Sequence, residues 1–178
     1  MKRLTRKENL KADLHGPSHL RAMLASSVLG TDVGKEGVQI LIDRLKSADL
    51  RTRYLAAHGI YEGKCQEALV PLLDAVFDPA NKGKTDTLAF PIKVLDCRNE
   101  FIRVFDILFY HTYAAKLAAK TVLEEQEFIV TDEQREEVAT KWYGILRDPK
   151  ECPEFDHARK DIESVLGRFG IPLQDPAA

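Results

Sequence analysis

The stretch VQILIDRL at residues 38–45 decides the fold, because its apolar pattern returns as LVPLLDAV at 69–76 and as FIRVFDIL at 101–108. Apolar residues at i, i+3, i+4 and i+7 indicate one face of a helix. Four apolar columns keep steps of 31 and 32 residues: Val38/Leu69/Phe101, Leu41/Leu72/Val104, Ile42/Leu73/Phe105 and Leu45/Val76/Leu108. A fixed period of this size is typical of solenoids, in which each repeat is too small to fold alone.

A second helix in each repeat keeps the same period. Its columns have steps of 32 and 31 residues: Ala56/Leu88/Ala119 and Ile60/Ile92/Leu123. We therefore predict an all-α protein, an α-solenoid of antiparallel helix pairs, with repeats at about 36–63, 66–96 and 98–125. The helices within them are expected at about 36–46, 50–62, 66–77, 85–96, 98–110 and 113–125. No segment shows the alternating pattern of a strand.

Helical caps are expected on both sides of the repeats, because a solenoid must cover its exposed ends. A helix over 17–29 has an apolar stripe at Leu20, Leu24 and Val28. Thr131 followed by Gln134 has the spacing of a capping box and opens a C-terminal cap over 131–169. Residues 1–15 are charged and lack periodicity, which predicts a flexible arm before a single domain over 16–178.

The stretch SADLRTRYLAAHGI at residues 47–60 resembles the HEAT repeat, with Asp between the helices, Arg early in the second helix and Ala-Ala after it. Asp49 and Arg53 hold these places, and Thr112 and Lys116 take the matching ones in the third repeat. Asp49 is also the expected N-cap of the helix over 50–62, because its carboxylate can accept from the free amides of the first turn. The resemblance implies a HEAT/armadillo-like superhelix in which such pairs are structural and tie neighbouring repeats together. Pro71 also matches the family's proline.

The second repeat departs from this pattern. It has no such acid–base pair, and its loop Asn81–Lys84 is longer. Pro91 falls inside the expected second helix, where proline costs roughly 3 kcal/mol unless the helix starts late or kinks.

The second helices carry the candidate binding residues, because in HEAT-like stacks these helices line the concave side. The face opposite Ala57 and Ile60 mixes aromatic and charged side chains, continued one repeat later: Arg51, Tyr54, His58, Tyr61, Asp86, Phe90 and Lys93. Aromatic residues mixed with arginine are typical of protein-binding hot spots. The alternative is an ordinary solvated face with a few half-buried rings. The chain is also similar to small stand-alone bacterial HEAT proteins, which mostly bind proteins and in some cases confer immunity to toxins.

Composition limits the other functions. With 44% hydrophobic and 30% charged residues and a net charge of −2, the chain lacks the basic footprint of a nucleic-acid binder. Cys65, Cys97 and Cys152 have no metal-ligand spacing and indicate reduced thiols in the cytoplasm. We expect neither secretion nor a membrane span, because residues 1–8 are mostly charged and no run of 18 apolar residues occurs in the sequence. We predict no metal, no cofactor and no catalytic residues.

Three further patterns leave alternatives open. Gly83-Lys84-Thr85 lacks the context of a phosphate loop, although a weak anion site at the next helix remains an alternative. The acidic stretch from Glu124 to Glu137 is a solvated face or a patch for a basic partner. DNA glycosylases and phycobilisome lyase-like proteins also use HEAT-like folds, but Trp142 has the helical spacing of a core residue.

Overall fold

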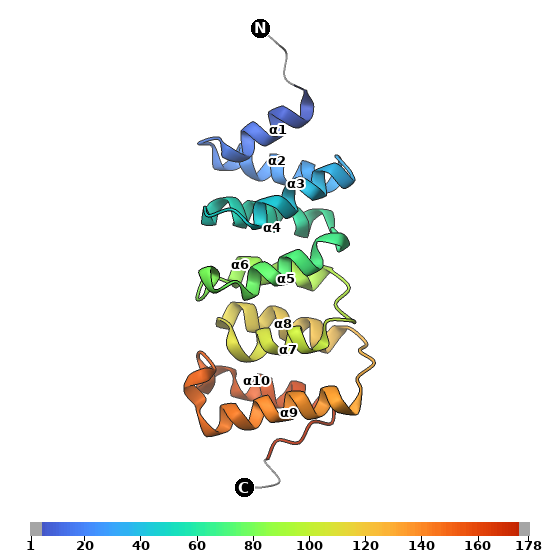
Figure 1. Cartoon of the computed structure of the whole chain (residues 1–178), viewed down its shortest axis with the longest axis vertical. Coiled ribbons are helices and arrows are strands. Elements are labelled where there is room, and N and C mark those ends of the chain that lie inside the picture. Colours follow the sequence, from blue (N-terminus) through green and yellow to red (C-terminus); the bar gives the residue numbers. More distant parts are fainter. Residues whose placement is uncertain (1–4, 175–178) are drawn as a thin grey trace. The chain divides into compact units, whose positions relative to one another are not determined.

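The computed structural model describes residues 5–174 and is all-α (Figure 1). Within these residues it has ten α-helices, four short 3-10 helices and no strand. Most helix–helix contacts join elements that are close in the chain. Contacts group the chain into two compact units, unit 1 (Met1–Asn81) and unit 2 (Lys82–Ala178). Among the described residues, no helix combines the length and apolarity needed to cross a membrane.

Unit 1 contains the N-terminal helices, the predicted first repeat and the first helix of the predicted second repeat, which the boundary at Asn81 divides. Its elements are α1 (Arg6–His15), α2 (His19–Thr31), α3 (Lys35–Leu45), α4 (Leu50–Gly63), η1 (Gln66–Ala68), α5 (Leu69–Phe77) and η2 (Pro79–Asn81). The most extensive helix contact joins α2 and α4, and α3 also packs on α4. Asp49 caps α4 as expected, since its carboxylate accepts from the Thr52 amide at 2.8 Å.

Unit 2 contains the remaining helices. Its elements are α6 (Asp86–Ala89), η3 (Phe90–Val94), α7 (Phe101–Tyr110), α8 (Tyr113–Glu125), α9 (Asp132–Arg147), η4 (Pro149–Glu151) and α10 (Phe155–Arg168). An aromatic cluster forms part of the core, with Phe101 in contact with Phe105, Phe128 and Phe169. The capping box of Thr131 and Gln134 is present and opens α9.

The repeated columns form the core, as the periodicity predicts. Eleven of their twelve residues are buried, and Ile42 is half-buried. The expected helices at 36–46, 50–62 and 113–125 match α3, α4 and α8 within one residue at each end. The sequence predicts the first helix of the third repeat from residue 98, but α7 begins at Phe101 because Arg98 and Asn99 form a turn.

The expectation of a flexible N-terminal arm over residues 1–15 is wrong for most of its length. Residues 6–15 are not loose but form α1, which packs against α2. Thr5 and Glu8 make a capping box, in which the Thr5 amide donates to the Glu8 carboxylate at 2.7 Å. Leu14 is the only residue of α1 that is fully buried, so no apolar period marks this helix in the sequence. Residues 1–4 of the expected arm lie outside the described residues.

Pro91 also changes the expected structure. The helix predicted over 85–96 is instead the short α6 followed by η3, a 3-10 helix. Pro91 is the second residue of η3, where a helix needs no amide donor. The change of helix type therefore removes the conflict between this proline and an uninterrupted α-helix.

Candidate protein-binding surface

Three of the four candidate residues of α4, Arg51, Tyr54 and His58, contact α2 or the segment before it. Arg51, Tyr54, His58 and Tyr61 are spaced to share one face of the helix, and all are half-buried. Both terminal nitrogens of Arg51 donate to the Gly16 carbonyl at 3.1 Å. The segment before α2 therefore covers part of the Arg51 side chain, and the rest stays exposed to solvent.

The rings of the stripe contact α2 in the same way. Tyr54 stacks on His19, with ring centroids 6.4 Å apart and planes inclined by 11°. The Nε2 atom of His58 lies 3.2 Å from the Ser27 hydroxyl, one of the two groups donating to the other. Helix α2 thus packs directly against these predicted binding residues of α4. The spacing of residues within α4 gave no indication of this neighbour.

Helix α2 adds a large apolar surface to this border. Leu20 and Leu24, four residues apart on one face, are 68% and 58% exposed. The sequence pattern suggested that these leucines lie on the inner stripe of a capping helix. The residues that α2 buries are instead mostly small: Ala22, Ala25, Ser26 and Leu29. Because alanine and serine are only weakly hydrophobic or polar, the apolar pattern of the sequence could not show which face of α2 is buried.

The remaining candidates belong to unit 2. Phe90 is 44% exposed, and the Lys93 ammonium lies 5.1 Å from the centroid of its ring. Asp86 accepts a hydrogen bond from the Thr112 hydroxyl. Leu117 on α8 is also exposed. Unit 2 thus presents one aromatic and one aliphatic side chain on elements that pack together, α8 and η3.

Asp49 and Arg53 act separately in the turn before α4. The Thr52 hydroxyl and amide both donate to Asp49 and lower the pKa of its carboxyl. Arg53 is 8% exposed and donates to the Ser47 carbonyl at 2.5 Å. No ion pair joins the two side chains within residues 5–174. Their bonds stabilise the turn of their own repeat, and a role between repeats stays a prediction.

Lys116 is buried, with 2% of its surface exposed. Its ammonium donates to the carbonyls of Leu108 and Phe109 at 2.9 and 2.6 Å, closing the C-terminal end of α7. A third hydrogen bond reaches the Cys152 sulfur at 3.3 Å. Burial lowers the pKa of Lys116, while Cys152 acts in the opposite direction. These contacts join Lys116 to the end of α7 and to Cys152, while the expected role of a Thr112–Lys116 pair between repeats stays a prediction.

Thr112 precedes α8 but makes no side-chain cap on it. Its hydroxyl instead bonds to Asp86 and lies 3.3 Å from the hydroxyl of Thr85, which is fully buried. The Nδ1 atom of His111 lies 3.3 Å from the same Thr85 hydroxyl. Burial lowers the pKa of His111 to about 4, and the charge of Lys116 adds to this effect. The group links the start of α6 to the α7–α8 turn.

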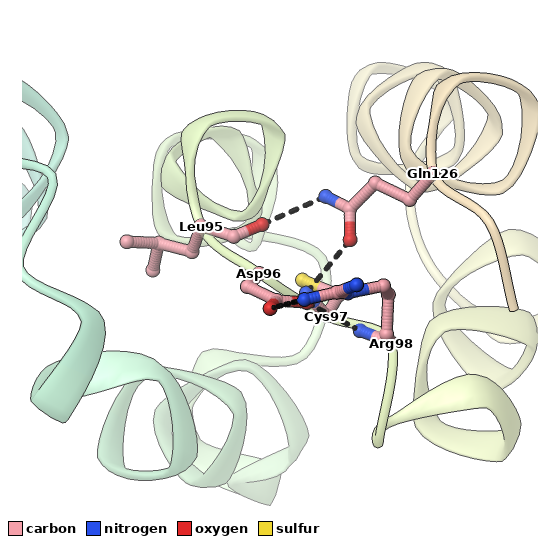
Figure 2. A network of polar contacts seen from close by, with 5 residues as sticks. All are labelled: Leu95, Asp96, Cys97, Arg98 and Gln126. Carbon is pink, nitrogen blue, oxygen red and sulfur yellow. Dashed lines mark hydrogen bonds and ion pairs between the residues drawn. The ribbon is translucent and has the colours of Figure 1, made fainter.

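A second polar network holds the loop before α7, and Figure 2 shows the Gln126 amide aimed at its backbone. The Gln126 amide nitrogen donates to the Leu95 carbonyl at 2.7 Å, while its oxygen accepts from the Cys97 amide at 2.8 Å. Arg98 makes a bidentate pair with Asp96 at 2.8 and 2.6 Å. This pair lowers the pKa of Asp96 to about 2. Burial raises the pKa of Cys97 to about 12, so its thiol stays protonated.

The acidic stretch is partly compensated. The carboxylates of Glu124 and Glu137 lie 3.8 and 2.9 Å from the ammonium groups of Lys120 and Lys141. The Asp132 carboxylate lies 2.6 Å from the Arg135 guanidinium. These ion pairs favour a solvated helix face over a dedicated acidic patch.

Comparisons with protein-family models, with curated proteins and with solved structures found no match to this chain. Within residues 5–174, no group of three or more His, Cys, Asp and Glu side chains is placed to hold a metal ion. The functional proposal below rests on Leu20 and Leu24 of α2 together with Arg51, Tyr54 and His58 of α4, named here the α2–α4 surface.

Proposed function

We propose that this chain is a HEAT-like α-solenoid that acts as a non-catalytic protein-binding module. The observation that carries the proposal is the exposure of Leu20 and Leu24, at 68% and 58%, on α2, the helix that contacts Tyr54 and His58 of α4. Neighbouring exposed apolar side chains are typical of surfaces that a partner covers. Tyr54 and His58 supply aromatic area and polar atoms on the same border.

A protein partner suits this surface better than a nucleic acid. Arg51, the cation of the α4 stripe, already donates both terminal nitrogens to the Gly16 carbonyl. The leucines offer no hydrogen bonds to phosphate groups, whereas they would lose their contact with water under an apolar partner surface. The three cysteines are free and buried, which is consistent with our proposal that the protein works in the cytoplasm.

The test is a pull-down from the native host with the wild-type chain and a Leu20→Gln/Leu24→Gln double variant. We expect the wild type to retain a specific protein that the variant loses, because both substitutions remove exposed apolar area without opening the core. The matched control is Ile129→Gln in unit 2, since Ile129 is 96% exposed and lies outside the surface.

The variants also separate binding from folding. Far-UV circular dichroism of the double variant should match that of the wild type, because neither leucine is buried. A Tyr54→Ala variant tests the aromatic part of the border, and Phe90→Ala tests the exposed ring of unit 2. Equal capture by the wild type and the Leu20/Leu24 variant would refute the α2–α4 surface as the binding site.

A further inference from the structure

A pocket beside α3 has a different chemistry from the α2–α4 surface. It has a volume of about 300 Å³ and lies in unit 1, between α1 and the C-terminal half of α3 with the turn that follows. The residues around it are Lys11, Ile40, Asp43, Arg44, Lys46 and Ser47. Half of these six side chains are cationic, in a chain whose net charge is −2.

The three cations around the pocket form no ion pair among the described residues, although the charge of Lys11 also acts on the carboxylates of Glu8 and Glu36. Two other cations of α1 are neutralised by acids: Arg6 lies 3.6 Å from Asp32, and Lys7 lies 2.8 Å from Glu36. The pocket's own cations, Lys11, Arg44 and Lys46, form no ion pair with any residue in the described range 5–174.

One carboxylate, that of Asp43, lines the pocket together with three cations, so the lining has an excess of positive charge. Asp43 in the pocket wall accepts a hydrogen bond from the Gln39 amide at 2.9 Å. Asp49, at the end of the turn, accepts from the hydroxyl and amide of Thr52.

Arg53 adds positive charge behind the turn that forms one wall. Its guanidinium donates to the Ser47 carbonyl at 2.5 Å, and its side chain is 8% exposed. The Nε atom of Arg53 is buried and has no hydrogen-bond partner among the described residues. The Ser47 hydroxyl accepts from the Asp49 amide at 3.2 Å, which leaves its hydrogen able to donate to a bound anion.

We propose that this pocket binds the phosphate group of a small phosphorylated molecule. A dianionic phosphate matches several cations that form no ion pair among the described residues, and a guanidinium such as that of Arg44 can bind two phosphate oxygens at once. The C-terminal end of α3 carries a partial negative charge, so several cations are needed to overcome it. Ile40 is 7% exposed and gives the pocket an apolar wall. At about 300 Å³ the pocket has room for a small organic group beside the phosphate.

Isothermal titration calorimetry of the full chain with glycerol 1-phosphate and with inorganic phosphate, at physiological ionic strength, tests the proposal. We expect saturable binding with one site per chain, tighter for the ester because its organic part contacts Ile40. Lys11→Ala, Arg44→Ala and Lys46→Ala should each weaken binding about tenfold, through the loss of one charge-assisted hydrogen bond.

The matched control is Lys35→Ala, which removes the same charge from the other end of the same helix. It should leave binding unchanged, because exposed charges separated by more than a Debye length are largely screened. An equal loss in Lys35→Ala, or no saturable binding of either phosphate, would overturn the site. Binding of duplex DNA or RNA with a steep salt dependence, without binding of the ester, would also overturn it. The Leu20→Gln/Leu24→Gln variant should keep phosphate binding, so the two proposals can fail independently.

Discussion

Gln126 shows how one side chain can complete the hydrogen bonding of a buried loop. Leu95 and Cys97 are almost fully buried, and their carbonyl and amide have no water to bond with. The side-chain amide of Gln126 donates to the Leu95 carbonyl at 2.7 Å and accepts from the Cys97 backbone amide at 2.8 Å. Because buried backbone groups without partners are costly, this residue stabilises the segment that leads into α7.

We predict that Gln126→Ala lowers the free energy of unfolding by about 1–3 kcal/mol, since both buried backbone groups lose their partner. Urea unfolding followed by circular dichroism measures this change. The control is Gln39→Ala, which removes an amide that bonds only to exposed Asp43 and should change stability by no more than about 0.5 kcal/mol. Equal effects of the two substitutions would show that the Gln126 bonds are not the cause.

His111 provides a pH-dependent part of the stability. Its pKa is about 4 in the folded chain, against an ordinary value of 6.5, because burial disfavours the imidazolium. The unfolded chain therefore takes up a proton at higher pH than the folded chain. The contribution is fully present above pH 6.5, is lost as the pH falls towards 4, and changes no further below that value.

We predict that His111→Gln makes stability less sensitive to pH between 6.5 and 4 than in the wild type. The wild-type slope due to this residue is at most about 1.4 kcal/mol per pH unit, the limit for one proton. Urea midpoints measured at a series of pH values give the slope. His157→Gln, at an exposed position, should keep the wild-type slope. An unchanged slope in His111→Gln would contradict the prediction.

Residue roles could be predicted where the partners are close in sequence. Asp49 was identified as the cap of α4 because a cap bonds to an amide three residues away. The partners of Gln126 and Lys116 include residues 29–36 positions away, Leu95, Cys97 and Cys152. Such contacts depend on how the helices pack, which residue spacing does not contain.

At the scale of elements, the packing of α2 on α4 depends on glycine. A Cβ atom on Gly59 would lie 2.5 Å from both the carbonyl oxygen and the hydroxyl oxygen of Ser26, and 2.9 Å from the Leu41 side chain. Ser26 is fully buried, and its hydroxyl bonds to the Leu55 carbonyl. The two helix backbones therefore approach so closely that no side chain fits between them at this point.

We predict that Gly59→Ala destabilises the protein by about 1–3 kcal/mol, because the added methyl forces the two helices apart. The matched control is Gly144→Ala in α9, where a Cβ would meet nothing within 4 Å. There the substitution should stabilise the helix by up to about 1 kcal/mol, since alanine is the better helix former. Thermal unfolding of both variants decides the matter, and a shift of the same sign in both would contradict the packing argument.

Helices with a clear apolar period were predictable, and helices without one were not. The columns of α3, α5 and α7 identified those helices because one face of each is buried. Helix α1 has a single fully buried residue, so only the capping-box spacing of Thr5 and Glu8 could have indicated it. In α2 the apolar pattern pointed to the wrong face: Leu20 and Leu24 are exposed, and mostly small residues form the buried face.

For the whole molecule, the two compact units raise the question of cooperativity. The regular period predicts a single domain over 16–178, whereas contacts group the chain into Met1–Asn81 and Lys82–Ala178. Because each unit has its own set of internal contacts, a change in one unit need not unfold the other. The only tryptophan, Trp142, is fully buried in unit 2 and donates to the Leu173 carbonyl at 3.1 Å.

Trp142 therefore reports on unit 2, whereas far-UV circular dichroism reports on all helices. We predict that Gly59→Ala, in unit 1, lowers the urea midpoint seen by circular dichroism and leaves the Trp142 fluorescence midpoint near its wild-type value. Ile162→Val, in the core of unit 2, should shift the fluorescence midpoint, at a cost of about 0.5–1.5 kcal/mol. Coincident transitions in both variants would show one cooperative domain instead, since agreement between probes is the signature of two-state unfolding.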